Sequence, residues 1–189
     1  DDGSTDQTPQ VLSRYASEGR VVSIRKEEPA GACAARNAAI HRAQGRFVTG
    51  IDDDDEFARD RVTNLVASFD PDLHSCVYTD LVVSSLGSRQ RLRFPAQVDL
   101  DRLLYRNVVG NQVLTLTDRF RTIGGFDECL SALQDYDLWI RLVARFGSAR
   151  KAPAGLYIQH TEHEGERIST SPKLRSAAYL AYTKHRVLM

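Results

Sequence analysis

The chain has 189 residues, with 25 basic and 25 acidic side chains and no formal net charge. Its hydrophobic content of 42% suffices for the core of one packed domain. The balanced charge argues against nucleic acid as a partner, and no apolar run reaches the roughly 18 residues of a membrane-spanning helix. The three cysteines are far apart and form no CxxC pair, so neither a zinc site nor a disulfide scaffold is indicated, and a reducing compartment is favoured.

The first residues predict a loop followed by a helix. Asp1-Asp2-Gly3-Ser4-Thr5-Asp6 consists of turn and cap residues, and Pro9 suits the first turn of a helix over about Thr8 to Ala16. Such a loop normally leaves the end of a strand, and no strand precedes it here. We therefore expect the chain to be a fragment that lacks the first strand or strands of its domain.

The first half then alternates between apolar strands and helices. The predicted strands are Val21–Arg25, Phe47–Ile51, Val77–Val83, Arg91–Phe94 and Gln112–Leu116, and the predicted helices are Cys33–Ala43 and Arg59–Phe69. This alternation predicts an α/β fold with a central, mostly parallel sheet flanked by helices. In such sheets ligands bind beyond the carboxyl ends of the strands, where both the Asp1-Asp2 loop and the run Asp52–Asp55 stand.

Residues 135 to 146 form the clearest predicted helix, because apolar side chains recur at helical spacing until Gly147. Asp135 falls on the apolar face one turn before Leu138, so its carboxylate should point inward or into a cleft. A carboxylate in a first helical turn is also favoured by the helix dipole alone. Trp139 lies on the apolar face and is expected in the core. A weaker helical pattern covers about 172–189, and no linker divides the chain.

Four consecutive aspartates, Asp52–Asp55, follow a predicted buried strand. Carboxylates this close repel one another, and partial burial increases the cost of their charge. A hard divalent cation such as Mg²⁺ or Mn²⁺ would supply the counter-charge, since it binds one or two carboxylates together with substrate phosphates. The run alone leaves a second interpretation open, a solvated acidic loop.

Taken together, these segments resemble family 2 glycosyltransferases of the GT-A fold over nearly the whole chain. The matching segments occur in the family's order: Asp1–Asp6, Gly31 with Ala35–Ala39, Ile51–Asp55 with its DxD element, Gly124–Glu128 and Gln134–Leu142. The resemblance implies a single domain, 1–189, with a nucleotide-sugar-binding half (1–95) and an acceptor-side half (96–189). It also implies that the missing first strand contributes to the nucleotide pocket of the complete domain.

The activity that the resemblance implies is an inverting, metal-dependent transfer of a sugar. The donor would be a nucleotide-sugar of the UDP, GDP or dTDP type, and the acceptor a hydroxyl of a saccharide or lipid-linked molecule in cell-surface polysaccharide synthesis. The metal would be Mn²⁺ or Mg²⁺. Such a protein is expected in the cytoplasm, with peripheral association at the inner face of the plasma membrane.

The resemblance also implies roles on the donor side. Asp1 and Asp2 would contact the base or ribose of the nucleotide, and Arg36 a phosphate or the base, although an exposed helix arginine is an equally good interpretation. Asp54 would bind the metal, Asp52 the ribose or the metal, and Asp53 belongs to the same donor site. A late histidine, His163 or its neighbour His160, would approach the metal, but an isolated loop histidine is more often a surface residue.

On the acceptor side the resemblance implies that Asp135 is the general base. Gln134 stands where the family usually has an acidic residue, so it would bind an acceptor hydroxyl without bringing a charge. Gly125 would lie on the acceptor side, and a plain turn at Gly124-Gly125 explains it equally well.

Two other functions remain as alternatives. An aspartyl-phosphate phosphatase also has DxD after a strand and uses carboxylate nucleophilic catalysis. That class generally has Thr or Val where this chain has Glu56, and it leaves the segment around Asp135 unexplained. The second alternative is a truncated, inactive module that keeps the fold and binds sugar or metal weakly.

Overall fold

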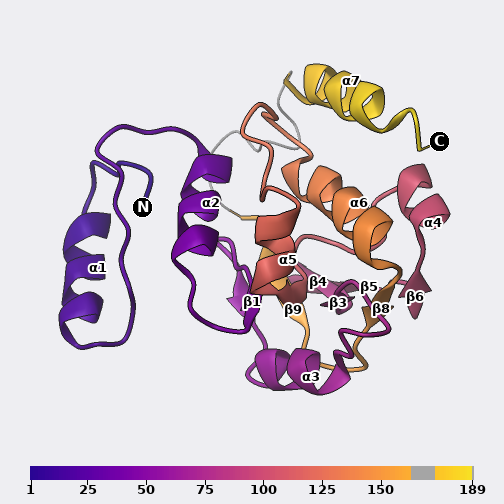
Figure 1. Cartoon of the computed structure of the whole chain (residues 1–189). Coiled ribbons are helices and arrows are strands. Elements are labelled where there is room, and N and C mark those ends of the chain that lie inside the picture. Colours follow the sequence, from indigo (N-terminus) through magenta and orange to yellow (C-terminus); the bar gives the residue numbers. More distant parts are fainter. Residues whose placement is uncertain (163–172, 189) are drawn as a thin grey trace.

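The computed structural model describes residues 1–162 and 173–188, in which helices and short strands alternate (Figure 1). The helices are α1 (Thr8–Ser17), α2 (Ala32–Arg42), α3 (Arg61–Ser68), α4 (Leu100–Tyr105), α5 (Thr117–Thr122), α6 (Gln134–Phe146) and α7 (Lys173–His185). The strands are β1 (Phe47–Thr49), β2 (Glu56–Phe57), β3 (Val77–Tyr78), β4 (Leu81–Ser85), β5 (Ser88–Leu92), β6 (Gln97–Val98), β7 (Leu114–Leu116), β8 (Ala149–Lys151) and β9 (Tyr157–His160). Among the described residues, no helix is long and apolar enough to cross a lipid bilayer.

The central sheet has the strand order β1-β7-β3-β8-β6. The predicted α/β class is confirmed, and the sheet is mixed in direction. Strands β1, β3 and β8 run the same way, but β7 lies antiparallel between β1 and β3, and β6 lies antiparallel at the edge. The expectation of mostly parallel pairing is therefore corrected. The helix–strand alternation behind it ends at β3, after which a β-hairpin follows, and antiparallel neighbours need no long crossover.

A second sheet, β2-β9-β4-β5, stands beside the first. The single strand expected at Val77–Val83 is divided, because β3 belongs to the central sheet and β4 to this one. Asp80 lies at the change of sheet, buried, and its carboxylate accepts hydrogen bonds from Arg91 (2.9 Å) and Lys151 (3.0 Å). These ion pairs hold the bend between the two strands.

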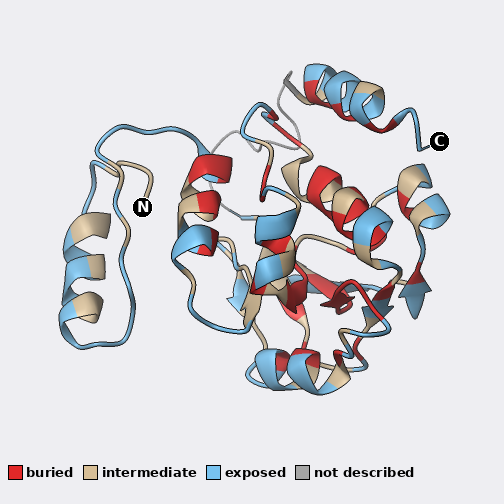
Figure 2. Cartoon of the chain, viewed as in Figure 1, coloured by how far each residue is buried: buried red, intermediate tan, exposed pale blue. Residues whose placement is uncertain are grey.

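The strand predicted at Val21–Arg25 does not form. This segment forms backbone hydrogen bonds with one residue, Asp1. Asp1 donates to the carbonyl of Ile24 (2.9 Å) and accepts from the amide of Lys26 (3.0 Å). These two bonds have the pattern of a parallel pairing but extend no further, and a strand needs a ladder of partners. The adjoining helix α1 has no buried residue, as Figure 2 shows by the absence of red on it.

The core lies between the central sheet and α6. Leu138 and Leu142 are fully buried there, and each such side chain contributes roughly 1.5–3 kcal/mol. Trp139 is 1% exposed and stacks on Phe120 of α5 with ring centroids 6.0 Å apart, so its predicted core position is confirmed. Because α6 is anchored along its apolar face, its first turn is held in a fixed position.

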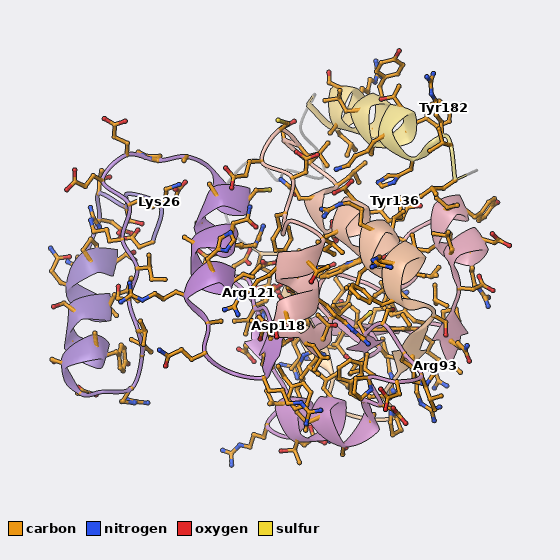
Figure 3. All side chains as sticks on the ribbon, in the orientation of Figure 1. Lys26, Arg93, Asp118, Arg121, Tyr136 and Tyr182 are labelled. Carbon is orange, nitrogen blue, oxygen red and sulfur yellow. The ribbon has the colours of Figure 1, made fainter. Side chains whose placement is uncertain are left out.

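Helix α2 is joined to the loop before α6 by buried polar contacts. The side chain of Asn37 accepts from the amide of Phe126 (2.8 Å) and donates to the carbonyl of the same residue (2.9 Å). At the C-terminal end of α2, Arg121 of α5 donates to the carbonyls of Ile40 (3.2 Å) and Ala43 (2.5 Å), so it satisfies groups that a helix terminus leaves open (Figure 3). The helix is thereby fixed at its middle and at its C-terminal end.

Candidate active site

A pocket of about 610 Å³ lies where the first turn of α2, the acidic run after β1 and the start of α6 meet. The side chains that line it include these members of the predicted site: Arg36, Asp52, Asp53, Asp54, Gln134 and Asp135. The acidic run connects β1 in the central sheet with β2 in the second sheet, so the pocket opens at the junction of the two. Residues about 80 positions apart in sequence are thus brought into one cavity.

The acidic run begins with a carboxylate that already has protein partners. Asp52 is half-buried, and its Oδ1 accepts from Arg36 Nη2 at 2.7 Å and from Gln112 Nε2 at 3.4 Å. Gln112 reaches this position because residue 50 is glycine, where a Cβ would lie 2.4 Å from the Gln112 amide oxygen. Arg36 in turn lies over the ring of Phe126, with its guanidinium carbon 5.5 Å from the centroid.

The last aspartate of the run supports the turn. Asp55 Oδ1 accepts from the amide of His160 (3.0 Å), and burial raises the pKa of its carboxyl. The Tyr157 hydroxyl accepts from the amide of Asp52 (3.1 Å) and hydrogen-bonds the Asp55 carboxylate. It therefore links the first and last aspartates of the run. Asp53 and Asp54 are exposed on the pocket wall, so the run is neither wholly buried nor wholly solvated.

The oxygen donors of this wall suit a hard divalent cation. Such an ion typically takes one or two carboxylates and completes its shell with substrate phosphate and water, which matches Asp52 and Asp54 beside an open cavity. Within the described residues no cluster of three or more potential ligands exists, so a phosphate-bearing substrate would have to complete the shell. His163 lies outside the described residues. His160 lines the pocket, with its Nε2 3.2 Å from Glu56 Oε1.

Asp135 lies in the first turn of α6 and lines the same pocket. Burial raises the pKa of its carboxyl to about 6, against the lowering effect of its own amide and that of Tyr136. The charge of Asp52 raises this pKa further and that of Arg36 lowers it. Leu133, just before the helix, has a φ of 59°, a left-handed conformation that is costly for a leucine and typical of functional sites. A carboxyl that titrates near neutrality in a cleft is suited to proton transfer.

Three predicted site residues lie outside the pocket lining. The Asp2 carboxylate accepts from the amides of Ala30 (2.9 Å) and Gly31 (2.7 Å), and these bonds lower its pKa. Asp1 is paired with Arg25 at 2.5 Å. Gly125 has a φ of 67°, and a Cβ there would lie 2.4 Å from Asn37 Oδ1, so glycine is required for the turn. In this structure all three residues hold loops in place.

The sequence interpretation missed several uncharged residues of the pocket. These are Asn107, Asn111, Gln112, Phe126 and Gln159. Tyr157, whose hydroxyl accepts from the amide of Asp52, lies outside the lining and was missed as well. Amides contribute neither charge nor a clear apolar period, so no local pattern distinguished them. The available signal was position, because residues 107 to 111 immediately precede the predicted strand Gln112–Leu116, of which Gln112 is the first residue.

Comparison with known proteins gives a family match. The model of "Glycosyl transferase family 2" matches residues 1–126. WcaA of Escherichia coli (strain K12), named as a colanic acid biosynthesis glycosyl transferase, is 36% identical over 194 residues, which cover 98% of this chain and 69% of WcaA. The glucosyltransferase WfaP of Escherichia coli is 24% identical over 159 residues, which cover 79% of this chain and 59% of WfaP.

Solved structures agree in fold. Residues 1–349 of TarS from S. aureus, in complex with UDP-GlcNAc, superpose with a TM-score of 0.78 at 20% identity, over 97% of this chain and 55% of that one. GalNAc-T7 with UDP, GalNAc and Mn²⁺ superposes with a TM-score of 0.70 at 17% identity, over 97% of this chain and 40% of that one. The chain thus spans about half the length of the structures it matches. The chain belongs to glycosyl transferase family 2, and its fold is that of the GT-A glycosyltransferases.

Proposed function

We propose that the protein transfers a sugar from a nucleotide-sugar to an acceptor hydroxyl with inversion of configuration, and that the pocket described above is its active site. The observation that carries this proposal is the placement of Asp135, with a pKa near 6, in one cavity with Arg36 and the acidic run. The names of WcaA and WfaP support a saccharide or lipid-linked acceptor in polysaccharide synthesis. We place the reaction in the cytoplasm, at the inner face of the plasma membrane.

The donor would be bound by residues of the first half of the chain, 1–95. Arg36 offers a guanidinium to a diphosphate, and Asp52, Asp53 and Asp54 face the same space. A Mn²⁺ or Mg²⁺ ion held by Asp52 and Asp54 would stabilise the charge that develops on the departing nucleoside diphosphate. Solved neighbours contain UDP with Mn²⁺ or GDP-Man with Mn²⁺, which supports a donor of this class.

The acceptor would be bound by the second half, 96–189. Asp135 takes the proton of the acceptor hydroxyl while the hydroxyl oxygen forms its bond to the anomeric carbon. On the opposite face, the bond from that carbon to the diphosphate oxygen breaks and its electron pair leaves with the nucleotide. One base and one displacement invert the anomeric centre. Gln134 would hydrogen-bond a second acceptor hydroxyl from the same wall.

Asp54→Ala should abolish metal-dependent nucleotide binding, because it removes an exposed carboxylate from the acidic run that lines the pocket. Calorimetry on the full-length protein with UDP, GDP and dTDP, with and without Mn²⁺, should show one nucleotide that binds at least tenfold tighter with the ion. The variant should lose that difference. Asp72→Ala, an exposed aspartate outside the pocket lining, is the control.

The rival functions give different results in the same experiment. If Asp54→Ala kept the same metal-dependent gain in nucleotide affinity as the unaltered protein, the proposed donor site would be contradicted. Phosphatase turnover with a phosphorylated Asp52 would favour the phosphatase. Nucleotide binding without any sugar transfer by the full-length protein would favour the inactive module.

The rate of transfer should depend on the ionisation of Asp135. Below pH 6 its carboxyl binds a proton and cannot accept another, so kcat/KM should fall about tenfold for each further pH unit. Initial rates between pH 5 and 8 would measure the midpoint. A midpoint near 4, the ordinary range of an aspartate, would contradict the assignment of this residue as the base.

A further inference from the structure

We propose that Asn107 is a positioning residue for Asp135, whose carboxylate it holds toward the pocket through a hydrogen bond from its amide nitrogen. The inference rests on the proposed function, because it gives a role to the environment of the proposed base. Neither residue type nor sequence spacing pointed to Asn107, which lies in the loop between α4 and β7.

The orientation of the Asn107 side chain is fixed by the backbone. Its Oδ1 accepts from the amides of Val109 and Gly110, both at 3.1 Å. Because the oxygen is committed to these two donors, the amide nitrogen must face the other way. That nitrogen lies 3.4 Å from Asp135 Oδ2 and 3.4 Å from the carbonyl of Gly110. The contact with Asp135 therefore follows from the folding of the loop.

The loop and the helix that carries Asp135 are fixed to each other by a second contact. Trp139, one turn after Asp135 on α6, donates from its indole nitrogen to the carbonyl of Gly110 at 3.0 Å. Gly110 has a φ of 91°, and a Cβ there would lie 3.0 Å from the ring of Phe94, so this backbone position is also tightly specified. Because Trp139 is buried, this hydrogen bond holds the loop at Gly110 and helix α6 in a fixed relative position.

An amide is chemically suited to this position. The charged groups that act on Asp135 are Asp52, from the acidic run, and Arg36, from α2. A lysine or arginine at position 107 would lower the pKa of the base and weaken it as a proton acceptor. A neutral donor instead orients one carboxylate oxygen and leaves the other for the acceptor hydroxyl. Asn107 thus fixes the direction of the carboxylate and lowers its basicity less than a cation at this position would.

Asn107→Asp tests this inference most sharply. The substitution keeps an oxygen for the amides of Val109 and Gly110 but replaces the donor facing Asp135 with a second acceptor. We expect the pKa of Asp135 to rise by about one unit or more, as for neighbouring carboxylates. Carbon-detected NMR titration of the Asp135 carboxyl measures this directly, without any assay of activity. At pH 6, kcat/KM should fall by about fivefold or more, because a pKa one unit higher leaves about a tenth of the carboxyl ionised instead of half, while binding of UDP with Mn²⁺ should change less than twofold.

The control places the same new charge elsewhere in the pocket. Asn111 also lines the pocket, but within the described residues no hydrogen bond joins it to Asp135. Asn111→Asp should shift the titration of Asp135 by clearly less than Asn107→Asp does. Equal shifts in the two variants, or an unmoved titration in Asn107→Asp with an unchanged melting temperature, would overturn the inference.

The two readouts also separate this inference from the proposed function. A raised Asp135 pKa together with a matching shift of the pH–rate profile supports both. A raised pKa with an unmoved profile would remove Asp135 as the base, so it would overturn the proposed mechanism and the positioning role of Asn107 with it.

Discussion

Asp135→Asn should lower kcat for sugar transfer by about 10²–10⁴-fold, the usual contribution of a general base. The amide has nearly the same shape as the carboxylate but cannot take the acceptor's proton. Nucleotide binding should change less than twofold, because Arg36 and the acidic run on the donor wall are untouched. Single-turnover rates together with nucleotide titrations by calorimetry would separate the two effects.

The same substitution should change stability with a defined sign. Asp135 has a folded-state pKa of about 6, above its ordinary value of 3.8. At pH 4 and below the carboxyl is largely protonated in the folded state, but above pH 6 its ionisation in the pocket wall destabilises the fold. Asp135→Asn should therefore melt at a higher temperature than the unaltered protein at pH 7.5, and at nearly the same temperature at pH 4.

A matched control isolates chemistry from helix electrostatics. Asp118 occupies the first turn of α5, as Asp135 does in α6, but it lies outside the pocket lining (Figure 3). Asp118→Asn loses the same interaction with a helix dipole and should transfer sugar at the rate of the unaltered protein. If Asp135→Asn retained more than a tenth of that rate, Asp135 would not be the base.

Local patterns in the sequence were enough for part of the fold and of the site. The apolar period of α6 predicted the helix, the burial of Trp139 and the inward position of Asp135, because helix geometry fixes all three together. The strand end at Asp52 likewise indicated which side chains would gather at one edge of the sheet. Where a single helix or strand determines the position of a side chain, the sequence of that element predicted the position.

Positions that depend on distant partners were not predictable. Asp80 is buried only because Arg91 and Lys151, 11 and 71 residues away, supply its counter-charges, and this bend divides what the pattern showed as one strand. Asn107 is aimed at Asp135 by a loop whose conformation depends on Trp139 and Phe94. No local period encodes such contacts, so the division of Val77–Val83 and the amides of the pocket were missed.

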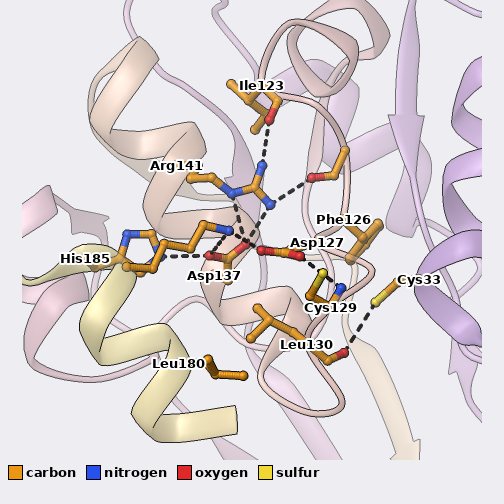
Figure 4. Close-up of polar contacts among 12 residues, drawn as sticks. Cys33, Ile123, Phe126, Asp127, Cys129, Leu130, Asp137, Arg141, Leu180 and His185 are labelled. Atoms are coloured by element: carbon orange, nitrogen blue, oxygen red, sulfur yellow. Dashed lines mark hydrogen bonds and ion pairs between the residues drawn. The ribbon is translucent and has the colours of Figure 1, made fainter.

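Asp137→Asn should destabilise the fold by about 3–5 kcal/mol, the usual cost of breaking a buried ion pair by removing one partner. Asp137 is fully buried in α6 and accepts from Arg141 (2.6 Å), Lys184 (2.8 Å) and His185 (2.8 Å), the last two from α7 (Figure 4). The amide NH₂ of an asparagine would face side chains that are themselves hydrogen-bond donors. The loss of the carboxylate charge would also leave the Arg141 and Lys184 cations without this counter-charge. Urea unfolding at pH 7 measures the difference.

The pH dependence of this effect is opposite to that of Asp135. The partners from α6 and α7 hold the pKa of Asp137 well below its ordinary value of 3.8. Its stabilisation is therefore complete above about pH 4 and is lost as the pH falls through the folded-state pKa. The stability gap between the unaltered protein and Asp137→Asn should accordingly narrow in acid.

A neighbouring, more exposed ion pair tests whether burial causes the large loss of stability expected for Asp137→Asn. Asp127 also binds Lys184, at 2.6 Å, but both side chains are partly exposed, so Asp127→Asn should cost no more than about 1 kcal/mol. If Asp137→Asn cost equally little, the desolvation of its carboxylate would cancel its ion pairs. Helix α7, which places Leu174 on the pocket wall, would then be held to α6 by apolar contacts and not by charge.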